Sequence, residues 1–132
     1  TYTAHGQVRV QDDLIAASDV SLTSAVSAVI ITAPVTATAG NLTISAGTNI
    51  SSNSPLVAGT DISITAGQSL MLTSTVNAGD DVLINAGAAF SATQTLTAGD
   101  QLSIVAGTTL TLAETADLTA GAGGVILTAP QI

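Results

Sequence analysis

The sequence predicts an all-β fold, a right-handed parallel β-helix (β-solenoid) of about six coils with about 20 residues in each coil. Three observations lead to this fold class. Glycine recurs at a fixed period, apolar and polar residues alternate between the glycines, and the strand-favouring residues Thr, Val and Ile are abundant. Alternation with a period of two is typical of strands, because successive side chains of a strand point to opposite faces.

Two series of glycines run in step along the chain, almost always 20 residues apart. Because both series keep the same period, the segment between them is a structural repeat. We expect these glycines at the corners of the coils, where a residue that accepts positive φ closes a tight turn. The two series are Gly40, Gly59, Gly79, Gly99 and Gly47, Gly67, Gly87, Gly107.

Each repeat is expected to contain about three short strands. A strand can pair only with its equivalent one period later, so the pairing is parallel and in register, and the crossover rule makes the winding right-handed. With about 4.8 Å between strands, six coils give a rod about 25–30 Å long. The predicted interior positions are Leu42, Ile44, Ile50, Ser52 and Leu56; Ile62, Ile64, Leu70, Leu72 and Val76; Val82, Ile84, Phe90, Ala92 and Leu96; and Leu102, Ile104, Leu110, Leu112 and, after a two-residue insertion, Leu118.

The chain is expected to be a single β-solenoid over residues 1–132 and a segment of a longer rod. Residues 39–120 hold the regular repeats, and 1–38 hold irregular first coils. Residues 121–132 form a last coil without a polar cap.

A second, longer repetition points in the same direction. The phrase VIITAP at 29–34 returns as VILTAP at 125–130, 96 residues later. We interpret it as a higher-order repeat of a longer protein, with coincidence in a low-complexity sequence as the alternative.

Composition excludes several classes of function. The chain has nine acidic residues and one basic residue, Arg9, and its net charge is −8. Nucleic-acid binding needs Lys and Arg and is not expected, and anionic membranes are disfavoured for the same reason. Cysteine is absent, which removes disulfides and thiol chemistry. No signal peptide or membrane-spanning run occurs, so we expect a mature or excised segment of a secreted or surface-exposed protein.

The phrase A-G-x-x-L-x-I-x-A-G-x-x-L-x-L resembles the repeats of filamentous haemagglutinin-type proteins. It occurs as AGTDISITAG (58–67), AGDDVLINAG (78–87) and AGDQLSIVAG (98–107). The match covers 39–120 well and 6–38 and 121–132 loosely. The resemblance implies a rod-like exoprotein of Gram-negative bacteria, secreted by the two-partner route, that serves as an adhesin or biofilm scaffold. The family's central repeats carry no catalytic residues.

Four aspartates fall in the two positions after glycines of the first series and are expected to stack at one corner, about 5 Å apart between coils. They suggest two interpretations. A row of carboxylates suits Ca²⁺, whereas Asp and Asn after Gly also close turns through hydrogen bonds to the backbone. We favour turn chemistry and predict no cofactor, with calcium as the alternative. The residues are Asp61, Asp80, Asp81 and Asp100, with Asn41 at the equivalent place of the preceding coil.

Catalysis is not expected. His5 is the only histidine, so a metal site or a Ser-His-Asp triad has no support. The acidic pairs Asp12–Asp13 and Glu114–Asp117 lack the basic and aromatic neighbours that a carbohydrate-cleaving β-helix uses. A Thr-x-Thr pair, Thr95 and Thr97, makes an ice-binding solenoid a remote alternative, but its ladder is broken in the neighbouring coil.

The final segment GGVILTAPQI (123–132) carries the strongest functional hint. It is apolar and uncharged, and an uncapped coil exposes unpaired strand edges. We therefore predict stacking of a further coil, from the same protein or another copy, on Val125, Ile126, Leu127 and Ile132. Two functions follow: a structural or adhesive extracellular rod, or a self-assembling filament subunit that stacks end to end. Lateral rod contacts or a host or matrix receptor are further expected partners.

Overall fold

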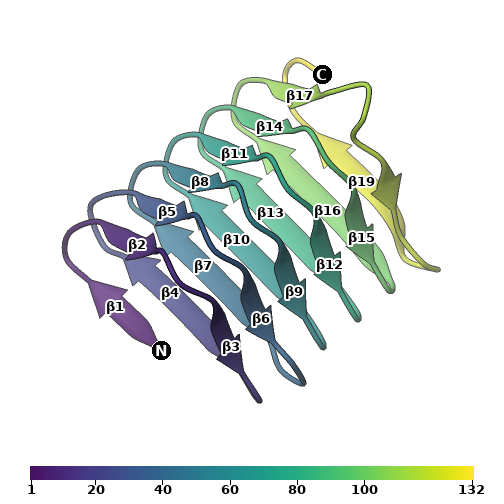
Figure 1. The fold of residues 1–132 in the computed structure, drawn as a ribbon. Helices are drawn as coiled ribbons and strands as arrows, with labels where there is room; N and C mark the ends of the chain where they lie inside the picture. Colours follow the sequence, from purple (N-terminus) through teal and green to yellow (C-terminus); the bar gives the residue numbers. More distant parts are fainter.

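The chain winds through about six turns of a parallel β-solenoid, seen in a computed structural model that describes all residues 1–132 (Figure 1). Three parallel sheets form its walls. Sheet A has seven strands: β1 (Tyr2–Ala4), β4 (Val20–Ser24), β7 (Leu42–Ala46), β10 (Ile62–Ala66), β13 (Val82–Ala86), β16 (Gln101–Ala106) and β19 (Gly124–Thr128). Sheet B has six: β2 (Val8–Val10), β5 (Val29–Ile31), β8 (Ile50–Ser52), β11 (Leu70–Leu72), β14 (Phe90–Ala92) and β17 (Leu110–Leu112). Sheet C has six: β3 (Leu14–Ala16), β6 (Val35–Ala37), β9 (Leu56–Ala58), β12 (Val76–Ala78), β15 (Leu96–Ala98) and β18 (Leu118–Thr119).

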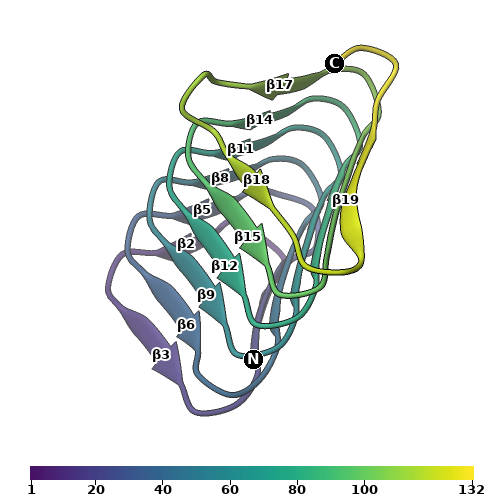
Figure 2. The ribbon, with the colours of Figure 1, turned by 90° about the vertical axis from the view of Figure 1, so that its right-hand side faces the viewer.

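The winding is right-handed, as predicted. In Figure 1 the strands of sheet A rise at the back, the chain crosses through sheet B and descends along sheet C in front, while the coils advance from left to right. Figure 2, which looks at the C-terminal end, shows the three walls around the stacked coils. No helix in the chain has the length and apolar character needed to cross a membrane.

Every strand pairs with its equivalent in the next coil, in parallel and in register. In sheet A, Val82 lies between Ile62 of the preceding coil and Leu102 of the following one. The first coils follow the same rule although their sequence is less regular: Leu14 pairs with Val35, 21 positions later. The register thus follows side-chain alternation, and the turns absorb differences in coil length.

The predicted interior ladders are confirmed. The buried apolar side chains form one continuous cluster along the axis. Phe90 lies between Leu70 and Leu110 in the ladder of sheet B, and all three are at most 2% exposed. Ser52 also points inward, and its hydroxyl donates to the Ser54 carbonyl over 3.0 Å. Among the predicted interior positions, those of β17 and β18 nearest the C-terminal end, Leu112 and Leu118, are only partly buried.

The corner glycines serve a different purpose from the one predicted. Gly124 is the one glycine with positive φ, at 76°, so the expectation of positive φ at the repeated glycines is wrong. Instead, a Cβ on Gly87 would clash with the Gly67 carbonyl oxygen, and a Cβ on Gly99 would clash with that of Gly79. Successive coils approach so closely at these two columns that only hydrogen fits between them.

Hydrogen bonding continues around the corners. Of the 84 backbone–backbone hydrogen bonds, 39 lie outside the strand ladders, and nearly all of these join one coil to the next. The Ala88 N–H, for example, donates to the Gln68 carbonyl over 2.8 Å. Turns that pair in this way leave few free backbone groups along the shaft, which stiffens it.

The long-range repetition does not mark equivalent positions. The first copy, around Val29–Ile31, forms β5 of sheet B, whereas the second lies in β19 of sheet A. The separation of 96 residues is not a whole number of coils, so the two phrases fall on different walls.

Replacement of Gly87 by Ala should destabilise the fold by about 3 kcal/mol, because the new methyl group meets backbone that cannot move without breaking the ladder. Chemical denaturation measures this loss. Gly6→Ala is the matched control, since a Cβ on Gly6 meets no atom within 4 Å. Equal stability of the two variants would show that close approach is not what requires glycine.

Candidate functional site

The predicted site residues lie in two regions, the corner between sheets C and A and the C-terminal end of the solenoid. We call the first region the acidic corner. It comprises the turns that lead from each sheet C strand into the next sheet A strand, and it holds Asp19, Asn41, Asp61, Asp80, Asp81 and Asp100.

One side chain in each coil of the acidic corner accepts a hydrogen bond from the next coil. The Oδ1 atom of Asp61 accepts the Asp81 N–H over 3.2 Å, and that of Asp81 accepts the Gln101 N–H over 3.0 Å. The row starts earlier, where Asp19 accepts the Asn41 N–H over 2.8 Å and Asn41 accepts the Asp61 N–H over 3.1 Å. These four residues, Asp19, Asn41, Asp61 and Asp81, are the Asx row.

The Asx row corrects the predicted turn chemistry in one respect. The expected side-chain-to-backbone bonds exist, but they tie a coil to its successor rather than closing a turn on itself. A coil of 22 residues separates Asp19 from Asn41, which hides Asp19 from a search at the 20-residue period. Position relative to the strand could have identified Asp19 as a member of the row. Asp19 directly precedes the strand residue Val20, just as Asn41 directly precedes Leu42, the register partner of Val20.

A second set of carboxylates lies beside the Asx row. Oxygen atoms of Asp80, Asp81 and Asp100 all lie within 4.8 Å of one another, and all three residues are exposed. The Asp81 charge raises the pKa of Asp80 above its ordinary value, with smaller contributions from desolvation and from the Asp61 and Asp100 charges. The Asp100 Oδ1 accepts the Gly123 N–H over 2.7 Å. Three carboxylates are a donor set that hard cations accept, so the calcium alternative keeps three of its four candidate residues, and Asp61 is not part of the group.

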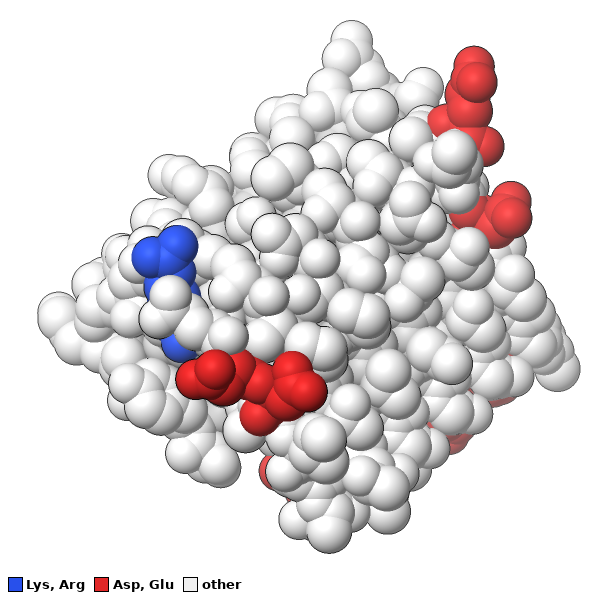
Figure 3. All heavy atoms as spheres, viewed as in Figure 1, with Lys and Arg blue, Asp and Glu red and all other residues white.

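The other candidate acids lie at the two ends of a different corner. Asp12 and Asp13 occupy the turn from β2 to β3 in the first coil, and Glu114 and Asp117 occupy the turn from β17 to β18 in the last full coil. Figure 3 shows these acidic groups at opposite ends of the visible face, with Arg9 near the first pair. The structure therefore does not bring the two pairs together, and His5 lies in the exposed turn after β1.

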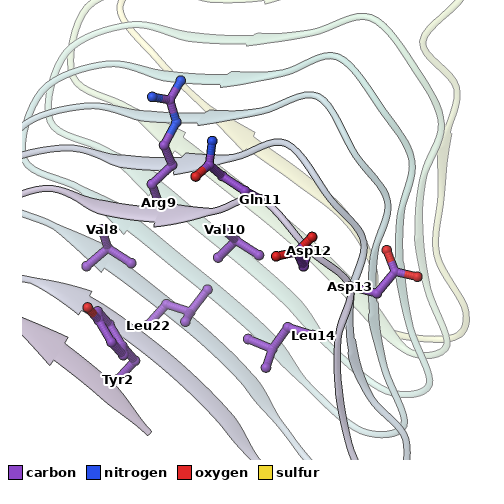
Figure 4. A pocket seen from close by; sticks show the side chains of 9 residues that line it. All are labelled: Tyr2, Val8, Arg9, Val10, Gln11, Asp12, Asp13, Leu14 and Leu22. Carbon is purple, nitrogen blue, oxygen red and sulfur yellow. The ribbon is translucent and has the colours of Figure 1, made fainter.

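The N-terminal end face opens into the interior. A hollow of about 300 Å³ lies beneath the first coil (Figure 4), and Val8, Val10 and Leu22 point into it from β2 and β4. Tyr2 borders the hollow and is 59% exposed, although its register partner Leu22 is buried. Tyr2 and the half-buried Leu14 are the apolar ladder residues accessible at this end, whereas Val8, Val10 and Leu22 are at most 9% exposed. The predicted sites did not include this feature.

Of the predicted stacking residues at the C-terminal end, Val125, Ile126 and Ile132 are exposed and Leu127 is half-buried. Val125 and Leu127 continue the interior ladders of Leu102 and Ile104, yet Val125 is 42% exposed because no coil covers it. Ile126 points outward from the same strand. The other edge of β19 carries no strand. After β19 the chain turns toward sheet B, where Gln131 forms an isolated parallel β-bridge with Thr109. The next residue, Ile132, is 75% exposed.

The threonines do not form a continuous ladder. Thr97 lies on the outer face of β15 between Asn77 and Thr119, and Thr95 precedes that strand. The outer row of sheet C also contains Val57.

Comparison of the chain with protein-family models, curated proteins and solved structures yields no match. The structure shows a β-solenoid with coils of about 20 residues, compatible with a β-helix repeat protein. The resemblance to the filamentous haemagglutinin type stays a prediction.

The Asx row predicts a difference between two variants of one residue. Asp81→Ala removes the acceptor for the Gln101 N–H, whereas Asp81→Asn keeps a carbonyl oxygen there, as Asn41 does naturally. Both remove the charge, so the Ala variant should be less stable than the Asn variant by about 1 kcal/mol. Urea denaturation measures this difference in stability. Equal unfolding midpoints for the two variants would show that the hydrogen bonds of the Asx row do not stabilise the fold.

Asp80 predicts a pH dependence. Because the pKa of Asp80 is raised by folding, the folded chain holds its proton more tightly than the unfolded chain, and stability falls as pH rises from the ordinary aspartate range through the raised value. Asp80→Asn should therefore melt slightly higher than the wild type near pH 7 at low salt. The difference should vanish below about pH 3, where the carboxyl is protonated in both states.

The same pair of proteins tests the calcium alternative. Millimolar calcium is expected to leave both melting temperatures unchanged relative to chelator. A rise seen in the wild type and lost in Asp80→Asn would instead establish a cation site at the acidic corner.

Proposed function

We propose that this chain is a segment of an extracellular structural rod, of the kind that filamentous adhesins and biofilm scaffolds use. The observation that carries the proposal is a single apolar core that runs the length of the axis through about six stacked coils. An architecture of this kind can be lengthened by further coils that continue the same ladders. The role is mechanical, with no catalytic step assigned.

The shaft suits this role. Backbone hydrogen bonds run along the axis at the walls and at the corners, so tension along the rod loads many of them at once. The outer walls carry mostly small polar side chains, and the chain has a single basic residue, Arg9, which leaves few cleavage sites for trypsin-like proteases. The low charge of the walls also fits close lateral packing of rods.

A self-assembling filament subunit is the second candidate. It is favoured by the matching strand directions of the two end faces: β1 and β19 both belong to the parallel sheet A, so the free edge of one can pair with the free edge of the other. In this role separate copies extend the rod, rather than further repeats of one chain.

Two measurements test the proposal. An antibody against the purified chain should label intact cells of the source organism, with an antibody against a cytoplasmic protein as the control. Labelling that needs permeabilised cells contradicts the extracellular rod. Electron microscopy of the purified chain over a wide concentration range separates the candidates, because a filament subunit forms rods far longer than about 30 Å.

A further inference from the structure

Two of the five asparagines begin the phrase Asn-x-Ser/Thr, in which the middle residue is not proline. They are Asn41, in the phrase NLT at 41–43, and Asn49, in the phrase NIS at 49–51. This phrase is the acceptor sequence for attachment of a sugar to the asparagine amide. A phrase this short also arises by chance, so its placement in the fold decides whether it can serve as an acceptor.

Strand alternation places both functional groups of each phrase on the outside of the solenoid. Asn41 and Asn49 directly precede β7 and β8, and both are exposed. The middle residues, Leu42 and Ile50, belong to the interior ladders and are at most 1% exposed. Because residues two apart in a strand face the same side, the hydroxyl group at the third position lies on the outer wall. These hydroxyl residues are Thr43, which is exposed, and Ser51, which is half-buried.

The next coil holds each of the two asparagines in one orientation. The Oδ1 atom of Asn41 accepts the Asp61 N–H over 3.1 Å, and that of Asn49 accepts the Ser69 N–H over 3.0 Å. The Thr60 hydroxyl donates to the same Asn41 oxygen. Only the oxygen of an amide can meet a backbone N–H, so these bonds turn the oxygen toward the next coil. They leave Nδ2 on the other branch of the amide, where it donates no hydrogen bond within the chain.

We propose that Asn41 and Asn49 are sites of N-linked glycosylation, with a diphosphate-activated sugar as the donor. The Nδ2 atom forms a bond to the anomeric carbon of the sugar, and the bond from that carbon to the diphosphate oxygen breaks with its electron pair. A base of the transferase takes one amide proton. The amide keeps its oxygen and one N–H, so the hydrogen bonds from Asp61 and Ser69 survive the modification. The coil can therefore carry a sugar at each site without loss of its stacking.

Both acceptors belong to a single coil, in which β7 is followed by β8 (Figure 1). At the place of Asn41 the two neighbouring coils have Asp19 and Asp61. The place of Asn49 is taken by alanine in the preceding coil and by serine in the following one. Sugars at these two corners would flank the outer wall of sheet A at one level of the shaft and leave the other coils bare. This inference goes beyond the proposed rod and does not depend on it.

The repeat supplies a matched pair of variants for a test by gain of a site. Asp61→Asn creates the phrase Asn-Ile-Ser at 61–63, whereas Asp81→Asn creates Asn-Val-Leu at 81–83, which lacks the hydroxyl group. Both positions belong to the Asx row and directly precede a strand of sheet A. The two variants therefore differ in the acceptor phrase and share the placement. Asp61→Asn should gain a third sugar attachment, and Asp81→Asn should gain none.

Intact-mass spectrometry of the chain purified from the source organism measures the attachments. The wild type should exceed the mass of its sequence by two sugar attachments. Thr43→Ala and Ser51→Ala keep both asparagines, and each should lose one attachment because the acceptor phrase is broken. Thr43→Ser keeps the hydroxyl group and should keep both attachments. Depletion of lipid-linked sugars in the source cells identifies the donor, since a lipid-linked donor requires them and a nucleotide-linked donor does not.

Two results would overturn the proposal. The first is a wild-type mass equal to that of the unmodified chain. The second is a sugar that remains when Thr43→Ala and Ser51→Ala are combined, because it is then attached elsewhere. Circular dichroism checks that each variant is folded. Either result leaves the extracellular rod untouched, since labelling of intact cells tests the rod separately.

Discussion

The close stacking of one coil on the next is the constraint on which the rest of the structure depends. Parallel strands at a fixed spacing require each coil to follow the path of its predecessor. A strand that slipped by one residue would turn its interior side chains to the outer face. The glycine columns show how strict this is, since at Gly67 and Gly87 the backbones meet without space for a single methyl group. Apolar side chains in the ladders and polar ones at the corners both follow from this repetition.

At the acidic corner, the stacking of coils creates both stabilising hydrogen bonds and repulsion between carboxylates. An Asp or Asn in each coil supplies an acceptor for an N–H of the next coil, as Asp61 does for Asp81 and Asn41 does for Asp61. The same stacking brings carboxylates together, which raises the pKa of Asp80. Asn41 and Gln101 interrupt the charge at two positions of this corner. The corner is therefore first a structural device, and any cation would use oxygens that the fold has already collected.

The end faces differ from the walls in the pairing of their backbone. Each wall pairs its backbone internally, so only the terminal strands β1 and β19 offer free sheet edges in sheet A. Edges of this kind promote pairing with other chains unless charge or irregularity blocks it. Asp12 and Glu114 lie at opposite ends of the corner between sheets B and C, whose intervening turns are uncharged, whereas the acidic corner carries charge along the shaft.

Period and alternation in the sequence were enough to predict the solenoid, its handedness, the parallel register and the apolar ladders of the regular repeats, including Ser52 and the insertion before Leu118. They did not identify the buried residues of the first coils, such as Val29 and Val35, or the alanines that end the strands, such as Ala66. These features depend on local patterns that repeat. Three-dimensional distances decided the rest. The close approach behind the glycines and the membership of Asp19 in the Asx row became visible only in the stacked coils. A linear pattern shows which residues recur, whereas the contacts between coils depend on turn lengths that differ from coil to coil.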